Sequence, residues 1–134
     1  MLTRIHHVGI VVPNLVEGLR FWRDLLGMPL VKTATLEDQG VRAALLATAT
    51  GEIELLEPLS PDNGVGRFLA RSGGGLHHLC FESDDVAADL AAARYRALPL
   101  IDQHPRPGLA GMICFLHPKA THGVLIEYAQ PPRE

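Results

Sequence analysis

The chain of 134 residues contains nearly the same pattern twice, and this internal duplication constrains its fold more than any other feature. Ile5-His6-His7-Val8 recurs as Leu76-His77-His78-Leu79, and Ile53-Glu54 recurs as Ile126-Glu127. His78 follows His7 by 71 positions and Glu127 follows Glu54 by 73, so the two copies keep almost the same register. Because a chain of this length is too short for two ordinary domains, we expect two modules that share one domain, residues 1–134.

Each copy is predicted to contain the same elements, in the order β-α-β-β-β. In the first copy, Asn14 is a typical helix N-cap and Gly27 a typical C-terminal stop, with apolar residues at helical spacing between them. The second copy places an alanine-rich helix from about residue 85 to 97. Expected strands lie near 5–12, 30–35, 41–48 and 52–57 and near 76–82, 98–102, 111–116 and 123–129, so module 1 covers about 3–59, a linker about 60–74 and module 2 about 75–131.

Strand alternation predicts where the repeated polar side chains point. Glu54 and Glu127 each lie between apolar neighbours, so the glutamates face away from the helix-covered side of the sheet. His7 and His78 fall on that same side, and we expect all four to meet in one cavity. One such glutamate alone is more often a solvated side chain than a ligand. Two imidazoles and two carboxylates repeated in register instead favour a divalent metal with open positions.

Composition excludes several other classes of function. The net charge of −3, the pI near 6.1 and the lack of a Lys/Arg cluster argue against a nucleic-acid partner. No apolar run approaches the roughly 20 residues of a membrane span, and Met1–Arg4 leads into strand-like sequence without a signal-peptide core. We therefore expect a cytoplasmic protein without a membrane partner. The two cysteines, Cys80 and Cys114, are interpreted as buried thiols.

The duplicated segments resemble the vicinal oxygen chelate superfamily, which includes glyoxalase I, extradiol dioxygenases, fosfomycin-resistance proteins and methylmalonyl-CoA epimerases. The likeness is strongest to the epimerases, and it covers nearly the whole chain. The resemblance implies an α+β fold in which two tandem βαβββ modules form a curved mixed sheet around a metal cavity. The segments that carry it are His6–Ile10, Gln39–Val41, Ile53–Pro58, Gly75–Cys80, Phe115–Lys119 and Gly123–Glu127.

The resemblance also implies roles for particular residues. His7, Glu54, His78 and Glu127 match the metal-ligand positions of the superfamily, for a divalent ion such as Co²⁺, Mn²⁺, Zn²⁺, Ni²⁺ or Mg²⁺. The implied activity interconverts (2R)- and (2S)-methylmalonyl-CoA with two opposed bases, through an enolate that the metal stabilises. One base maps onto Glu127. The other maps onto Asp38, where a Glu is usual, with Glu37 beside it.

The acyl-CoA substrate and the oligomeric state are further expectations from this resemblance. Lys119 is a candidate contact to a CoA phosphate, although a solvated lysine is the commoner role of such a residue. Related proteins are often homodimers. Ala110, where the family often has His, and the shorter Asp38 both depart from the epimerase pattern. Other functions therefore stay open: a glyoxalase-like lyase or isomerase, an oxygen-activating dioxygenase, and a small-molecule binding protein.

Overall fold

The computed structural model describes residues 1–133, which form two compact units. The N-terminal unit is His7–His77, and the C-terminal unit combines Met1–His6 with the chain from His78 onward. The elements are β1 (Leu2–Val11), α1 (Leu15–Leu19), η1 (Arg20–Leu25), β2 (Leu30–Leu36), η2 (Glu37–Gln39), β3 (Val41–Ala47), β4 (Glu52–Pro58), α2 (Gly64–Ser72), β5 (Gly75–Ser83), α3 (Val86–Tyr95), β6 (Arg106–Gly108), β7 (Gly111–Leu116), η3 (Pro118–Ala120) and β8 (Ile126–Gln130).

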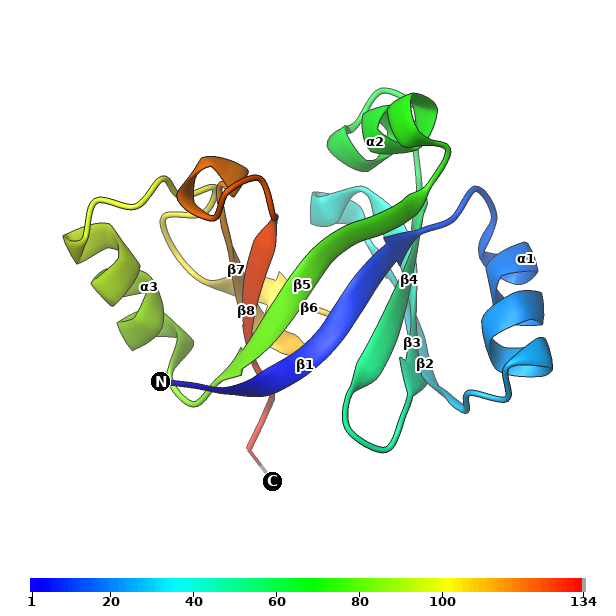
Figure 1. Cartoon of the computed structure of the whole chain (residues 1–134), viewed down its shortest axis with the longest axis horizontal. Coiled ribbons are helices and arrows are strands. Elements are labelled where there is room, and N and C mark those ends of the chain that lie inside the picture. The colour runs from blue at the N-terminus through cyan, green and yellow to red at the C-terminus, as the bar shows by residue number, and fades with distance from the viewer. Residues whose placement is uncertain (134) are drawn as a thin grey trace. The chain divides into compact units, whose positions relative to one another are not determined.

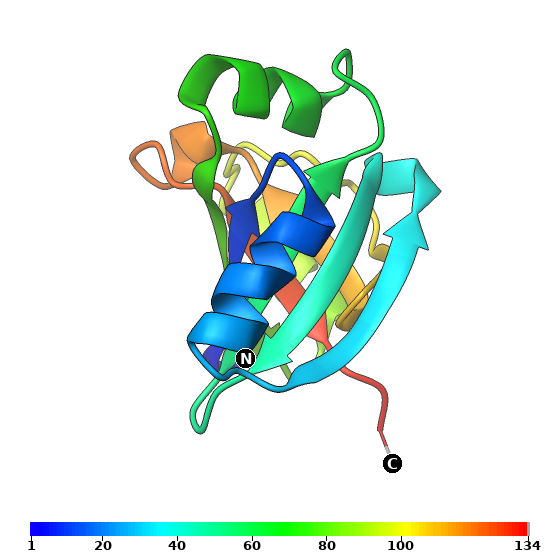
Figure 2. The same ribbon diagram turned by 90° about the vertical axis from the view of Figure 1, so that its right-hand side faces the viewer.

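In the N-terminal unit, the strands lie in the order β2-β3-β4-β1. The β1 strand runs parallel to β4, and the β2/β3 and β3/β4 pairs are antiparallel. Helix α1 covers one face of these strands (Figure 2). The predicted alternation explains this packing, because Ile10, Leu46 and Leu55 point to that face and form a core with Leu15 and Trp22.

The helix of this unit begins as the sequence predicts but changes its winding midway. Asn14 accepts a hydrogen bond from the Glu17 N–H at 3.0 Å, which confirms it as the N-cap. After Leu19 the chain continues as the π-helical turn η1, in which the Leu26 N–H bonds to the Phe21 carbonyl at 3.0 Å. Gly27, with φ of +82°, follows as the predicted stop.

The C-terminal unit repeats the plan with the strand order β5-β8-β7-β6. The β5 strand is parallel to β8, and the β8/β7 and β7/β6 pairs are antiparallel. Helix α3 packs on one face of this set (Figure 1), where Val86 and Leu90 meet Cys114 and Tyr128. The two units therefore share the same parallel and antiparallel pairings, and the predicted duplication is a structural one.

The expected strand at 98–102 is wrong. This segment forms a single antiparallel bridge, Leu100 to Leu116, with backbone hydrogen bonds from Ile101 to Phe115 and from His117 to Pro99, and the pairing ends there. The short strand β6 then pairs with β7. Asp102 is the physical reason for the difference. Its carboxylate Oδ2 accepts the Phe115 N–H at 2.8 Å, so a side chain takes the place that the backbone of a neighbouring strand would occupy.

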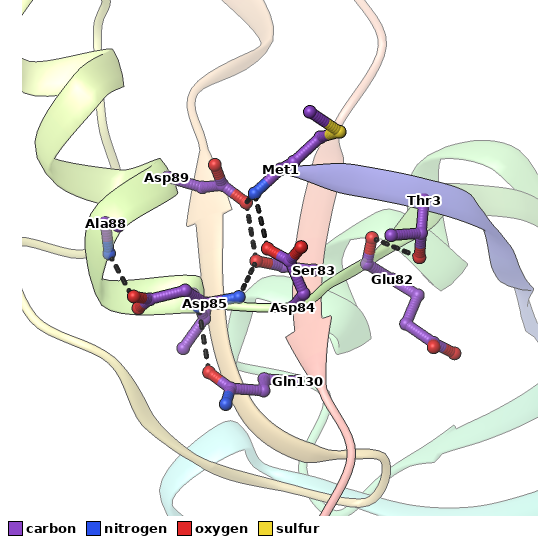
Figure 3. A network of polar contacts seen from close by, with 10 residues as sticks. Met1, Thr3, Glu82, Ser83, Asp84, Asp85, Ala88, Asp89 and Gln130 are labelled. Atoms are coloured by element: carbon purple, nitrogen blue, oxygen red, sulfur yellow. Dashed lines mark hydrogen bonds and ion pairs between the residues drawn. The ribbon is translucent and has the colours of Figure 1, made fainter.

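The start of β1 and the start of α3 are linked by a polar network within the C-terminal unit (Figure 3). The Met1 ammonium lies 2.6 Å from Asp84 Oδ1 and 3.0 Å from Asp89 Oδ2. Its hydrogen bond to Asp84 lowers the pKa of that carboxyl and raises the pKa of the ammonium. Asp85 caps α3 by accepting the Ala88 N–H at 3.1 Å. Within residues 1–133, none of the helices has both the length and the hydrophobicity for crossing a bilayer.

Candidate metal centre

The N-terminal unit brings together the first two predicted ligands. Glu54 on β4 stands opposite Gly9 of β1, and His7 precedes Gly9 by two residues, so both side chains emerge on the same face. His7 Nε2 lies 3.5 Å from Glu54 Oε1. Both side chains are buried, with 0% and 7% of their surfaces exposed. Gly9 places no side chain between them.

The C-terminal unit builds the same pair from the second copy of the pattern. Glu127 on β8 stands opposite Cys80 of β5, and His78 precedes Cys80 by two residues. His78 Nε2 lies 3.0 Å from Glu127 Oε1, and the exposed fractions of the two side chains are 2% and 5%. In each unit a histidine on the first strand therefore meets a glutamate on the parallel last strand, in an identical register.

The neighbours of the glutamates confirm the predicted alternation. Leu55 is completely buried in the core under α1, while Tyr128 packs in the core under α3. Glu54 and Glu127 consequently lie on the face opposite α1 and α3, respectively. The duplicated sequence thus produces two buried His–Glu pairs rather than two pairs of solvated residues.

The chemistry of these donors fits a divalent cation. Burying a carboxylate is unfavourable unless a cation or a hydrogen-bond donor compensates it. An imidazole nitrogen beside a carboxylate oxygen is a donor set that Zn²⁺, Co²⁺, Mn²⁺ and Ni²⁺ accept, and the carboxylates also suit Mg²⁺. In both pairs the Nε2 atom faces the carboxylate, so Nε2 is the nitrogen that each ring presents.

Phe115 is a neighbour of this site that the sequence did not reveal. It stands opposite Glu127 in the β7/β8 register, and its ring meets the His78 imidazole edge to face, with centroids 5.6 Å apart and an interplanar angle of 86°. The equivalent position in the other copy is Leu45, opposite Glu54. An alignment of the two copies could have pointed to this residue, because Phe115 replaces Leu45 at an equivalent position of the repeat.

The candidate bases lie in the turn after β2. Glu37 and Asp38 occupy η2, and both side chains are exposed. Gly40, with φ of +70°, ends this turn, and its carbonyl accepts a hydrogen bond from Asn63 Nδ2 at 2.8 Å. Asn63 also caps α2 by accepting the Gly66 N–H at 2.8 Å, so one side chain ties the turn to that helix.

Lys119, the predicted contact to a CoA phosphate, is exposed in η3. Its backbone N–H donates to His117 Nδ1 at 3.1 Å, and this contact stabilises the turn. The side chain is therefore on the surface, where a large anionic ligand has access to it. Its contact to CoA stays a prediction, as do the catalytic roles of Glu37, Asp38 and Glu127.

A family comparison covers most of the chain. Residues 6–115 match the model of the glyoxalase/bleomycin resistance protein/dioxygenase superfamily. Among curated proteins, the chain is 34% identical to an ethylmalonyl-CoA/methylmalonyl-CoA epimerase of Cereibacter sphaeroides, over 97% of this chain and 99% of the relative.

Solved structures agree with this comparison. A variant of Streptomyces coelicolor methylmalonyl-CoA epimerase in complex with 2-nitronate-propionyl-CoA is 40% identical, with a TM-score of 0.92 over 98% of this chain and 96% of that chain. Methylmalonyl-CoA epimerase from Mycobacterium tuberculosis is 36% identical, with a TM-score of 0.93 over 98% and 90%. The predicted fold class is confirmed by this likeness.

Proposed function

The chain belongs to the glyoxalase/bleomycin resistance protein/dioxygenase superfamily, and within it we propose that the protein is an epimerase that interconverts (2R)- and (2S)-methylmalonyl-CoA. Likeness to methylmalonyl-CoA epimerases over nearly the full chain supports the substrate class. The observation that carries the proposal is the buried His–Glu pair that both units build in the same register.

We infer that His7, Glu54, His78 and Glu127 together bind one divalent cation. Each pair supplies only two donors, whereas catalytic metal sites generally use three or more protein ligands. The equal register and burial of the two pairs support their joint use. A bound divalent cation would act as a Lewis acid toward the thioester carbonyl, which makes the neighbouring α-proton easier to remove.

The protein itself contributes to this chemistry by orienting its metal donors in advance and by excluding water from them. Both rings sit on strand backbones and present Nε2, and both carboxylates are almost completely shielded from water. Donors that are already oriented need no reorganisation when charge develops on the substrate, and a site with little water makes their electrostatic effect larger.

Inversion at the α-carbon requires two proton-transferring groups on opposite faces of that carbon. We propose Glu127 for one face and Asp38 or Glu37 for the other. One carboxylate removes the α-proton, and the carboxylic acid on the opposite side delivers a proton there. Each positioned base contributes about 10²–10⁴ to the rate. Because η2 is tied by Gly40 and Asn63, the backbone of the turn determines whether the shorter Asp38 reaches the substrate.

The surface of the protein supplies the remaining parts of the proposal. Lys119 would contact a CoA phosphate, which its exposure and positive charge allow. A homodimer in the cytoplasm stays a prediction. Light scattering would measure the oligomeric state, and a charge-reversing Lys119→Glu variant would raise the KM for methylmalonyl-CoA with little change in kcat if the contact exists.

The test of the proposed function is isotope exchange. The protein is incubated with (2R)-methylmalonyl-CoA in D₂O with added Co²⁺, and again with excess chelator. We expect deuterium at the α-carbon together with formation of the (2S) epimer, both abolished by the chelator. Exchange without inversion would contradict the two-base assignment. Turnover of a glutathione hemithioacetal without turnover of methylmalonyl-CoA would replace the epimerase with a glyoxalase-like activity.

A further inference from the structure

Asp102 is the residue around which the second copy departs from the first. In the N-terminal unit, β2 pairs with β3 from Leu30 to Leu36, whereas the corresponding segment before Asp102 pairs with residues 115–117 through one bridge and its flanking backbone hydrogen bonds. The carboxylate of Asp102 uses the freed position, with Oδ2 accepting the Phe115 N–H at 2.8 Å. The end of strand pairing at this point therefore coincides with a side-chain contact that the first copy lacks.

The same carboxylate holds a second group. Asp102 Oδ1 accepts a hydrogen bond from Arg106 Nε at 2.9 Å, and the pair is largely shielded, with exposed side-chain fractions of 13% and 29%. The Arg106 guanidinium lies over the Phe115 ring, 5.7 Å from its centroid. One carboxylate thus fixes both the backbone of Phe115 and the cation above its ring.

Phe115 connects the Asp102–Arg106 pair to the candidate metal centre, because it contacts His78. Its ring packs edge to face against the His78 imidazole, whose Nε2 lies 3.0 Å from Glu127 Oε1. An imidazole has a broad torsional minimum about its last side-chain bond, so a neighbouring ring that restricts this rotation sets the direction of Nε2. The N-terminal copy has Leu45 at this position, which offers no aromatic face or edge.

We propose that Asp102, acting through Arg106 and Phe115, is the positioning residue that orients His78 for metal binding. The inference rests on the proposed function, because it takes His78 as a ligand. Residues behind a metal ligand typically change metal affinity by about 10–100-fold when they are removed. We expect a change of up to this size here, because Asp102 bonds to Arg106 and to the Phe115 N–H, and Phe115 packs against His78.

The experiment measures Co²⁺ binding by the whole protein. Asp102→Ala is expected to raise the dissociation constant for Co²⁺ about 10–100-fold in a chelator competition. It should also alter the visible Co²⁺ spectrum, which reports ligand geometry. Phe115→Leu, which copies Leu45, is expected to have the same direction of effect. Arg106→Lys keeps the cation but loses the planar fork, so we expect an intermediate affinity.

Matched controls separate positioning from folding. Arg4→Met removes an exposed ion pair of the same unit, whose Arg4 Nε lies 3.0 Å from Glu82 Oε1, and should leave the Co²⁺ spectrum unchanged. Wild-type affinity and an unchanged spectrum in folded Asp102→Ala or Phe115→Leu would overturn the inference. If Asp102→Ala does not fold, Phe115→Leu decides. A His78→Ala variant that binds Co²⁺ like the wild type would instead refute the proposed ligand set.

Discussion

Glu127→Gln separates the two roles proposed for this residue, because glutamine keeps the shape and one oxygen donor but is not a base. Its internal duplicate is the control: Glu54 has the same register and nearly the same burial, with 7% against 5% of the side chain exposed, but is proposed as a ligand only. Both variants should need more metal. Only Glu127→Gln should then remain inactive when metal is saturating.

The expected magnitude follows from the loss of one base. Removal of a positioned base costs about 10²–10⁴ in rate, which corresponds to about 3–5 kcal/mol of activation free energy. The rate of Glu54→Gln at saturating Co²⁺ should remain within about tenfold of the wild-type rate. Glutamine keeps one oxygen donor, and a change near the metal mainly shifts the affinity for the metal.

The assay follows inversion and deuterium uptake separately for the two epimers. With Glu127→Gln, the remaining base should still exchange the α-proton of one epimer with D₂O, whereas interconversion of the epimers is lost. Exchange from both epimers, or inversion within threefold of the wild-type rate, would refute the role of Glu127 as a base. Equal losses in Glu54→Gln and Glu127→Gln at saturating metal would show that both act only as ligands.

Three further predictions use other parts of the structure. Burial raises the pKa of the Cys114 thiol to about 12, and nearby carboxylates add to the effect. The native protein should therefore resist the thiol reagent dithionitrobenzoate at pH 8 and react fully in urea. Because the thiol has a higher pKa in the folded state than in the unfolded state, its contribution to the free energy of unfolding is complete below pH 9 and falls as the pH rises toward 12, by at most about 1.4 kcal/mol per pH unit. Asn63→Ala removes the cap on Gly66 and the bond to Gly40, and should lower the urea unfolding free energy by about 1–2 kcal/mol, against about 1 kcal/mol for Asn14→Ala, which loses only a cap; equal losses would contradict the added bond. Metal-free protein should unfold at a lower temperature than Co²⁺-loaded protein, and no shift in Tm would argue against a site in the folded state.

The sequence predicts the paired residues of this protein well because duplication and strand period act together. Once His7 and His78 are aligned, a two-residue alternation determines which face Glu54 and Glu127 occupy, and the parallel registers confirm it. Capping by Asn14 is a local interaction and is predicted for the same reason.

The features that the sequence does not reveal depend on tertiary contacts. The segment before Asp102 begins with apolar residues like the start of β2, but its strand pairing ends after one bridge, where the Asp102 side chain accepts the Phe115 N–H. The π-helical continuation after Leu19 is likewise a choice between hydrogen-bond patterns that similar apolar spacing permits. Neither the intrinsic preferences of the residues nor the spacing of apolar positions predicts the end of strand pairing before Asp102 or the π-helical turn after Leu19.

In the proposed metal site, the His–Glu pairs of both units bind one cation. Anomalous diffraction from a crystal of the Co²⁺-loaded protein tests it most directly. We predict one ion per chain, with His7 Nε2, His78 Nε2 and one oxygen each of Glu54 and Glu127 at about 2.0–2.2 Å from it. An ion bound by a single pair, or a separate ion on each pair, would contradict the claim.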